Sequence, residues 1–471
     1  MDTTVVDSHS AVTGVLPYDP RTQPRLSFSA ATKAFRDGYD TPRAFLERCL
    51  ATFERREPEV RAFVFTNLSG ARAAADAATA RYRAGRPLSP MDGLPLGIKD
   101  VFETEDMPTE MNSPAFVGYR TGRDAAHVYA LRHAGALIVG KTVTTEFAQG
   151  ASGATRNPFD TSRTPGGSSS GSAAAVGAGM VPVATGSQAR GSIIRPASYC
   201  ANYALKPSFG ALNSQGTLGL GAPSQCVVGI HAATLQDCWN TACYIGSAAG
   251  GDPGCPGLDG EMDLGSGRKL ERVIRLDTLG WEETDLEIRE KLELFLRQLE
   301  RLGVTVLGRR DDSRIEDFER ALRRIPEFMW PILLWEMRWP GWLARDRGAH
   351  LISDIVLDRL KRAEAMSIDE YRQAIVRRQA LHRSFLALAD LADAAVTLCS
   401  PGPAPIGTSV GNPVFADISS NLLCPSFALP LLEVEGLPLG IQLLGYPNQD
   451  FKLAQHAHWL SIAYLGQCSD M

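Results

Sequence analysis

Lysine is scarce in this chain, whose 471 residues include only 8 Lys against 40 Arg. A buried lysine can lose its proton inside a protein, whereas an arginine cannot, so each lysine is a candidate base. The formal net charge is −5, and basic residues are therefore not in excess. This balance predicts neither a nucleic acid nor a membrane as a partner.

Long apolar runs are also lacking. No stretch of about 18 apolar residues is present that could span a bilayer, and residues 1–14 lack the pattern of a secretory signal. The nine cysteines are scattered without a CxxC pair, which argues against a zinc site and for reduced thiols. We therefore expect a cytoplasmic protein that carries no metal.

What the chain does contain is an alternation of helical and strand-like segments. Residues 27–86 follow a helical pattern, residues 94–101 form an apolar run typical of a strand, and a helix over 124–133 precedes a strand over 136–139. Such alternation favours an α/β fold. No clean linker interrupts the chain, so the sequence predicts one large domain rather than two or three.

The predicted boundaries follow the composition. We expect an N-terminal arm over residues 1–25, one domain over residues 26–462 and a C-terminal tail over residues 463–471. Within the domain, residues 284–395 are charged and helical and are interpreted as an insertion.

Two short motifs match known patterns but lack the required context. The sequence GALIVGKT at 135–142 satisfies the phosphate-loop pattern, yet a helix precedes it and its centre forms strands. We interpret it as a strand edge with a surface Lys141. The sequence GSSSG at 167–171 satisfies the nucleophile-elbow pattern, but none of the downstream histidines sits in the context of a catalytic triad.

A third pattern combines three segments, GLPLGIKD at 93–100, GGSSSGSAAAVGAG at 166–179 and GSQARGSIIRPASYC at 186–200. A serine nucleophile needs a base, and Lys99 lies in an apolar strand where burial would lower its pKa. The Ser168 hydroxyl both donates and accepts, so it could pass a proton between Ser192 and Lys99. Taken singly, Lys99 could equally lie at a sheet edge, and Ser168 in an ordinary flexible loop.

These segments resemble the amidase signature family, the Ser-cisSer-Lys amidohydrolases. The family spacing between the two serines is 24 residues, as it is between Ser168 and Ser192, and TTEFAQG, LKPSFG and GLPLGIQLLG occur in the matching order. The resemblance extends over residues 26–462. It implies a single α/β domain with a central mixed β-sheet covered by helices.

The resemblance also implies roles for particular residues. Ser192 would be the nucleophile, Lys99 the general base and Ser168 the proton relay, with a cis peptide bond at Ser168. The oxyanion would be held by backbone N–H groups of four consecutive residues, Ala189, Arg190, Gly191 and Ser192. No metal or organic cofactor is implied.

The nucleophile segment departs from the common family text. Gln188 replaces an Asp, Arg190 replaces a Gly, and an Arg follows the nucleophile by three residues, as in the malonamidase branch. That likeness implies that Arg195 anchors a substrate carboxylate, and we expect Gly167 and Gln188 to contribute to substrate binding. A structural ion pair is the alternative for Arg195. Arg190 could narrow the pocket or add a second anion contact.

The predicted function is hydrolysis of a small carboxylic amide to a carboxylate and ammonia or an amine. The expected partners are a small-molecule amide and, as a candidate assembly, a homodimer. One alternative is the glutaminase-type A subunit of a tRNA-dependent amidotransferase, against which the departures at Gln188 and Arg190 count. Another is a non-catalytic binding protein of the same fold. The tryptophans between Trp330 and Trp342 could border the substrate entrance, a subunit contact or the core.

Overall fold

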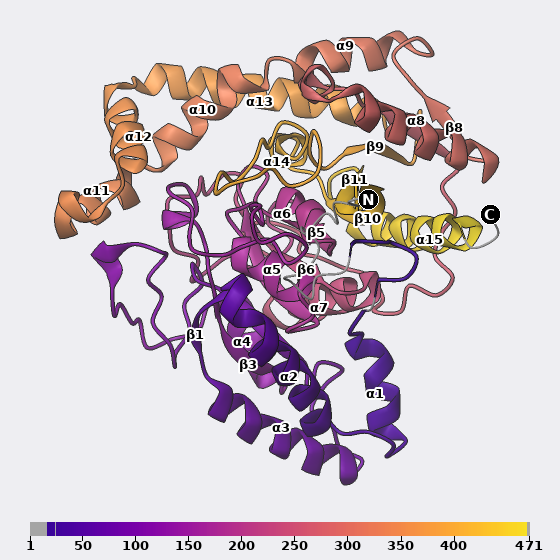
Figure 1. Cartoon of the computed structure of the whole chain (residues 1–471). Helices are drawn as coiled ribbons and strands as arrows, with labels where there is room; N and C mark the ends of the chain where they lie inside the picture. The colour runs from indigo at the N-terminus through magenta and orange to yellow at the C-terminus, as the bar shows by residue number, and fades with distance from the viewer. Residues whose placement is uncertain (1–16, 24, 469–471) are drawn as a thin grey trace, which may run out of the picture.

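The computed structural model describes residues 17–23 and 25–468. The chain forms one α/β domain around an 11-stranded mixed sheet, as the sequence predicted (Figure 1). The strand order across the sheet is β1-β3-β2-β4-β6-β5-β10-β11-β9-β7-β8. The strands are β1 Phe63–Thr66, β2 Pro95–Lys99, β3 Leu137–Thr142, β4 Val183–Gln188, β5 Tyr203–Lys206, β6 Val227–Ala232, β7 Arg272–Arg275, β8 Thr305–Leu307, β9 Ala394–Leu398, β10 Ser426–Val434 and β11 Leu437–Leu444.

Helices cover both faces of the sheet. The α-helices are α1 Phe28–Arg36, α2 Pro42–Val60, α3 Leu68–Arg83, α4 Ala126–His133, α5 Ser170–Gly177, α6 Ile194–Tyr199, α7 Leu235–Ala249, α8 Leu286–Arg301, α9 Ser313–Leu322, α10 Ile325–Glu336, α11 Arg338–Gly348, α12 Asp354–Ala365, α13 Ile368–Leu386, α14 Asp417–Asn421 and α15 Asp450–Cys468. In Figure 1 helices α1–α3 gather at one end of the molecule and α8–α13 at the other. The segments around α5 and α6 lie between these two groups.

The sheet mixes parallel and antiparallel pairs. β2 runs parallel to both β3 and β4, and β7 runs parallel to β8 and β9, whereas β10 and β11 form an antiparallel hairpin. Every residue of β3, β4 and β6 is buried, and their sequences accordingly show no regular alternation of apolar and polar residues.

The position of β3 overturns one expectation. Lys141 is not at the surface, because β3 lies between β1 and β2 instead of at the edge of the sheet. The Lys141 ammonium is buried and lies 2.9 Å from the Asp100 carboxylate. The edge strand on this side of the sheet is β1, a four-residue strand within the stretch that the sequence predicted to be helical.

The described segments nearest the chain ends differ from the predicted arm and tail. Residues 1–16, 24 and 469–471 lie outside the described residues. Tyr18 is buried, and its N–H donates to the Gly436 carbonyl at 2.7 Å in the β10–β11 turn. At the other end α15 runs from Asp450 to Cys468 and so continues past residue 462.

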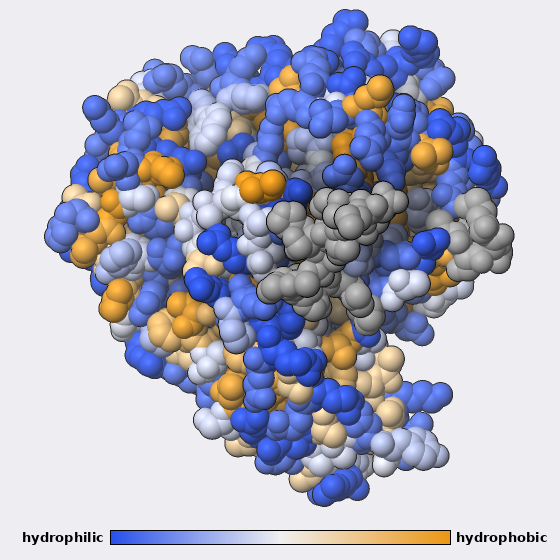
Figure 2. Space-filling view, viewed as in Figure 1, coloured by the Kyte–Doolittle hydropathy of each residue, from blue (hydrophilic) through white to orange (hydrophobic). Residues whose placement is uncertain are grey.

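No helix in the described ranges is both long and apolar enough to cross a membrane. The face in Figure 2 is mostly hydrophilic, with hydrophobic residues in small separate groups. The stretch 284–395 contains α8–α13, but its short strand β8 pairs with β7 and extends the main sheet.

Candidate active site

Two adjacent parallel strands bring the candidate residues together. Lys99 is the last residue of β2, and β4 runs parallel to β2 and ends at Gln188. The carboxyl ends of parallel neighbours meet at one edge of a sheet, where α/β proteins commonly place their sites. The loop after β4 carries Ser192 into α6, and the loop before α5 carries Ser168.

Lys99 is fully buried beneath three hydroxyl groups. Its Nζ lies 2.8 Å from Ser168 Oγ, 3.0 Å from Ser169 Oγ and 2.9 Å from Ser187 Oγ. No acidic side chain in the described part of the chain forms an ion pair with Lys99. Burial therefore lowers the pKa of Lys99 to about 7, so a large fraction of the amine is neutral at neutral pH.

The peptide bond between Gly167 and Ser168 is cis, as the family resemblance implied. The chain before it requires small residues. Gly166 has φ +80°, and a Cβ there would lie 2.9 Å from the Pro196 backbone. The loop thus packs directly against the first turn of α6, which places Ser168 beside the segment that carries Ser192.

Gln188 fixes the shape of the nucleophile loop. Its side-chain oxygen accepts from the backbone N–H groups of Ile193 at 2.8 Å and Ile194 at 3.0 Å, and its amide nitrogen donates to Ser420 Oγ at 3.0 Å. Gln188 is fully buried and does not line the candidate cavity. Gln188 therefore holds the nucleophile loop in shape and does not make the substrate contact expected from the sequence.

The loop leaves its backbone donors available. None of the N–H groups of residues 189–192 donates to an acceptor in the described ranges. Gly191 permits this close approach, because a Cβ there would lie 2.9 Å from Ala416 Cβ and 3.0 Å from Pro413 Cβ. Free N–H groups beside a nucleophile can stabilise a developing oxyanion.

Ser168 and Ser192 open into one small cavity of about 120 Å³. The cavity is lined by Thr145, Ala148, Gln149, Gly150, Ser168, Arg190, Ser192, Arg195, Arg359, Val410, Gly411 and Pro413. None of these residues is acidic, so the cavity presents three guanidinium groups to a ligand.

Arg195 is buried without an acidic partner. Its Nη2 donates to the Gly167 carbonyl at 2.5 Å, and its Nε has no acceptor among the described residues. Burial lowers the pKa of Arg195 to about 10, which still leaves it charged at neutral pH. No carboxylate in the described part of the chain lies within ion-pair distance of Arg195, so the alternative of a structural ion pair is not seen.

Two residues of the site were not predicted from the sequence. Ser187 reaches Lys99 from the end of β4, and Arg359 reaches the cavity from α12, far along the chain. The Arg359 Nη1 donates to the Gln149 carbonyl at the cavity wall. Neither residue belongs to a recognisable motif, because each depends on how distant elements pack together.

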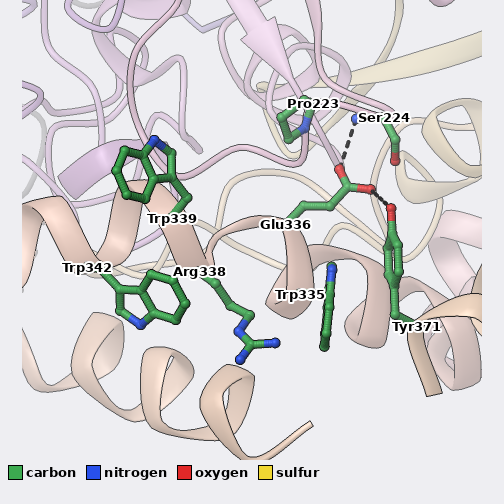
Figure 3. Close-up of a pocket in the computed structure, with 8 residues that line it drawn as sticks. All are labelled: Pro223, Ser224, Trp335, Glu336, Arg338, Trp339, Trp342 and Tyr371. Carbon is green, nitrogen blue, oxygen red and sulfur yellow. Dashed lines mark hydrogen bonds between the residues drawn. The ribbon is translucent and has the colours of Figure 1, made fainter. Parts of the chain in front are cut away.

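The tryptophans between residues 330 and 342 divide between two places. The Arg190 guanidinium, which lines the candidate cavity, lies over the Trp330 ring at 4.6 Å from the ring centre. Trp335, Trp339 and Trp342 instead line a separate open groove (Figure 3). There Arg338 lies over the rings of Trp335 and Trp342.

Hydrogen bonds also link residues that line the groove in Figure 3. The Glu336 carboxylate accepts from the Ser224 N–H and the Tyr371 hydroxyl, each at 2.9 Å. The Tyr371 ring stacks on Trp335 at 5.4 Å. The groove shares no lining residue with the cavity that holds Ser192.

The comparison with protein families agrees with this geometry. The family described as Amidase matches residues 44–454. This chain belongs to the amidase signature family. The activity that the family shares is hydrolysis of C–N bonds, and this chain is a hydrolase of that general kind.

Relatives and solved structures extend the match. The chain is 33% identical over 91% of its length to the A subunit of the glutamyl-tRNA(Gln) amidotransferase of Chloroflexus aggregans, 94% of which is covered. A crystal structure of an amidase has a TM-score of 0.80 and 27% identity, covering 92% of this chain and 98% of that one. The peptide amidase PAM, in complex with chymostatin, has a TM-score of 0.77 and 25% identity over 94% of this chain and 98% of its own.

The relatives correct the expectation about partners. The sequence predicted no nucleic acid as a partner, yet relatives that align with about nine-tenths of the chain belong to an enzyme named for a tRNA. The exclusion was wrong because a net charge averaged over a chain does not decide whether an enzyme of such a family acts with a nucleic acid. The relatives also do not bear out the likeness to the malonamidase branch, which still rests on the nucleophile segment alone.

Proposed function

We propose that this chain hydrolyses the C–N bond of a small carboxylic amide through an acyl-enzyme on Ser192. One observation carries the proposal. A buried Lys99, whose pKa burial lowers to about 7, lies 2.8 Å from Ser168 Oγ, and Ser168 opens into the same cavity as Ser192. A non-catalytic binding protein would have no need for a lysine held in this ionisation range.

In the proposed reaction Ser192 Oγ attacks the amide carbonyl and its proton passes to Ser168, which passes its own proton to Lys99. The N–H groups of residues 189–192 stabilise the oxyanion. As the C–N bond breaks, the proton returns through Ser168 to the leaving nitrogen, which departs as ammonia or an amine. Water then attacks the acyl-enzyme by the same route and releases the carboxylate.

Arg195 is proposed to hold a carboxylate of the substrate. It is buried, keeps an unsatisfied Nε and has no acidic partner among the described residues. A buried and unpaired guanidinium is costly unless a ligand completes it, and a planar guanidinium binds a carboxylate with two hydrogen bonds. This arrangement supports an amide that carries an anionic end.

The sequence relatives favour a more specific candidate, the A subunit of a glutamyl-tRNA(Gln) amidotransferase. In that case glutamine would be the amide, and the ammonia would be passed on rather than released. The Ser192 chemistry would be the same. Purification of the chain from its own cells together with other subunits, and glutamine-dependent ammonia release, would support this candidate.

Labelling by a fluorophosphonate probe tests the nucleophile. We expect the wild-type protein to be labelled at Ser192 and the Ser192→Ala variant to remain unlabelled and inactive. Ser170→Ala is the matched control, because Ser170 lies in the same serine-rich segment but its hydroxyl bonds to the Val143 carbonyl. Labelling that persists in Ser192→Ala would contradict the proposal.

A further inference from the structure

The candidate cavity holds one charge arrangement that the proposed chemistry does not use. Arg190 stands two residues before Ser192, and its Nε and Nη2 bond to the two carboxylate oxygens of Asp417 at 3.2 Å and 2.9 Å. The guanidinium also lies over the Trp330 ring, with its Cζ atom 4.6 Å from the ring centre. Arg190 is therefore held rigidly in the cavity wall and does not swing freely in solvent.

The backbone reinforces this placement. The Arg190 carbonyl accepts from Ser420 Oγ at 2.7 Å, so both the main chain and the side chain of Arg190 are fixed to α14. Arg190 lines the cavity, whereas Asp417 does not, and the Asp417 side chain is only 9% exposed. The guanidinium thus stands between the cavity and the carboxylate.

Because the guanidinium lies between the cavity and the Asp417 carboxylate, it determines which charged group faces a substrate. Arg190 is the only side chain in the described ranges that pairs with the Asp417 carboxylate. Without Arg190, that carboxylate would be unpaired beside the cavity and suited to bind an ammonium group. With Arg190 in place, the carboxylate is occupied, and the cavity wall carries Arg190, Arg195 and Arg359 with no acidic group.

We propose that Arg190 is a specificity-determining residue, which restricts the site to carboxylate-bearing amides that have no ammonium group near the carboxylate. This inference rests on the proposed function for the site, and it adds a substrate class. Arg190, Arg195 and Arg359 all line the cavity, so an ammonium group bound there beside a carboxylate would face guanidinium groups. At an effective dielectric constant of about 20, repulsion between like charges within about 10 Å of each other changes affinity by at least about tenfold.

A matched pair of amides tests the proposal. Glutaramate and glutamine share one carbon skeleton, an amide and a carboxylate, and differ in the α-ammonium of glutamine. Binding is measured by calorimetry in the Ser192→Ala background, so that the result does not depend on turnover. We expect glutaramate to bind at least about tenfold more tightly than glutamine, and butanamide, which lacks the carboxylate, to bind more weakly than glutaramate.

Variants at Arg190 separate charge from shape. Arg190→Ala should reduce the preference for glutaramate at least about tenfold, because Asp417 becomes available to the ammonium. Arg190→Lys should keep the preference, and Arg190→Gln, which can still bond to Asp417 without a charge, should lose it. Adding Asp417→Asn to Arg190→Ala should remove the gained affinity for glutamine.

Several results would overturn the inference. Equal binding of glutamine and glutaramate by the parent protein would do so, as would an unchanged preference in a folded Arg190→Gln variant. Equal binding would also favour the glutamine-using candidate, whereas an unchanged preference would show that a group other than Arg190 sets it. Absence of fluorophosphonate labelling in the wild-type protein would instead remove the proposed function, while the binding preference would still report on Arg190.

Discussion

At the scale of single residues, Lys99 sets the pH range of the proposed reaction. Burial lowers the pKa of Lys99 to about 7, and only its neutral form can accept a proton. We therefore expect kcat/KM to rise about tenfold per pH unit below pH 7 and to level off above pH 8. The measurement is kcat/KM for an amide that does not titrate between pH 5.5 and 9.5.

Lys206 provides the control for this profile. It is also buried, and burial lowers its pKa to about 8, but its Nζ bonds to the Pro207 carbonyl and does not reach the cavity. Lys206→Met should leave the midpoint of the profile in place. A midpoint that moves in Lys206→Met, or a flat wild-type profile from pH 6 to 9, would argue against Lys99 as the titrating base.

Lys99, Ser168 and Ser192 could be predicted from the sequence, because each belongs to a motif and a serine nucleophile requires a base and a route for its proton. Ser187 could not be predicted, since its contact with Lys99 arises from the parallel pairing of β2 and β4. Gln188 was assigned to substrate binding for a related reason. A motif shows that a side chain is present but not whether its amide turns outward or into the protein.

At the scale of elements, the nucleophile loop depends on close packing against the segment before α14. A Cβ on Gly191 would lie 2.9 Å from Ala416 Cβ, so Gly191→Ala should push the loop away from that segment. A displacement of the oxyanion donors by a fraction of an ångström should lower kcat/KM by up to about 100-fold. Steady-state kinetics on folded protein, with its far-ultraviolet circular dichroism checked, measure the effect.

Gly466 in α15 supplies a matched control, because a Cβ there meets no atom within 4 Å. Gly466→Ala should leave kcat/KM unchanged. Activity close to wild type in Gly191→Ala would show that the loop tolerates the added carbon and that its packing does not position the donors.

The type of the long elements was predictable, but the neighbours of each strand were not. The strand over 94–101 and the helix over 124–133 correspond to β2 and α4, since each has a clear apolar period and a defined end. The expectation of a surface Lys141 was wrong, because the sequence does not show that β1 covers the outer side of β3. β1 itself is only four residues long and lies between two helices, so its period is too short to stand out.

At the scale of the whole molecule, composition gave a wrong answer about partners. A net charge of −5 describes the average of the chain, and it excludes only a strongly basic surface. Recognition of a nucleic acid by an assembly is decided by whichever component contacts it. The charges that do matter in this chain are local, as the three guanidinium groups beside Ser192 illustrate.

Tyr18 attaches the N-terminal segment to the β10–β11 hairpin, which gives a prediction about stability. Its buried ring packs at 5.5 Å against Phe159, and its hydroxyl donates to the Pro430 carbonyl in β10. Removal of a buried aromatic ring costs about 3–5 kcal/mol, so Tyr18→Ala should lower the free energy of unfolding by about that amount. Because Tyr18 does not line the candidate cavity, kcat/KM at low temperature should stay within twofold of wild type.

Urea denaturation measures the loss of stability. Tyr39→Ala is the control, because Tyr39 is 88% exposed and its replacement should change the denaturation midpoint little. Equal midpoints for the two variants would show that the N-terminal segment does not hold the β10–β11 hairpin in place.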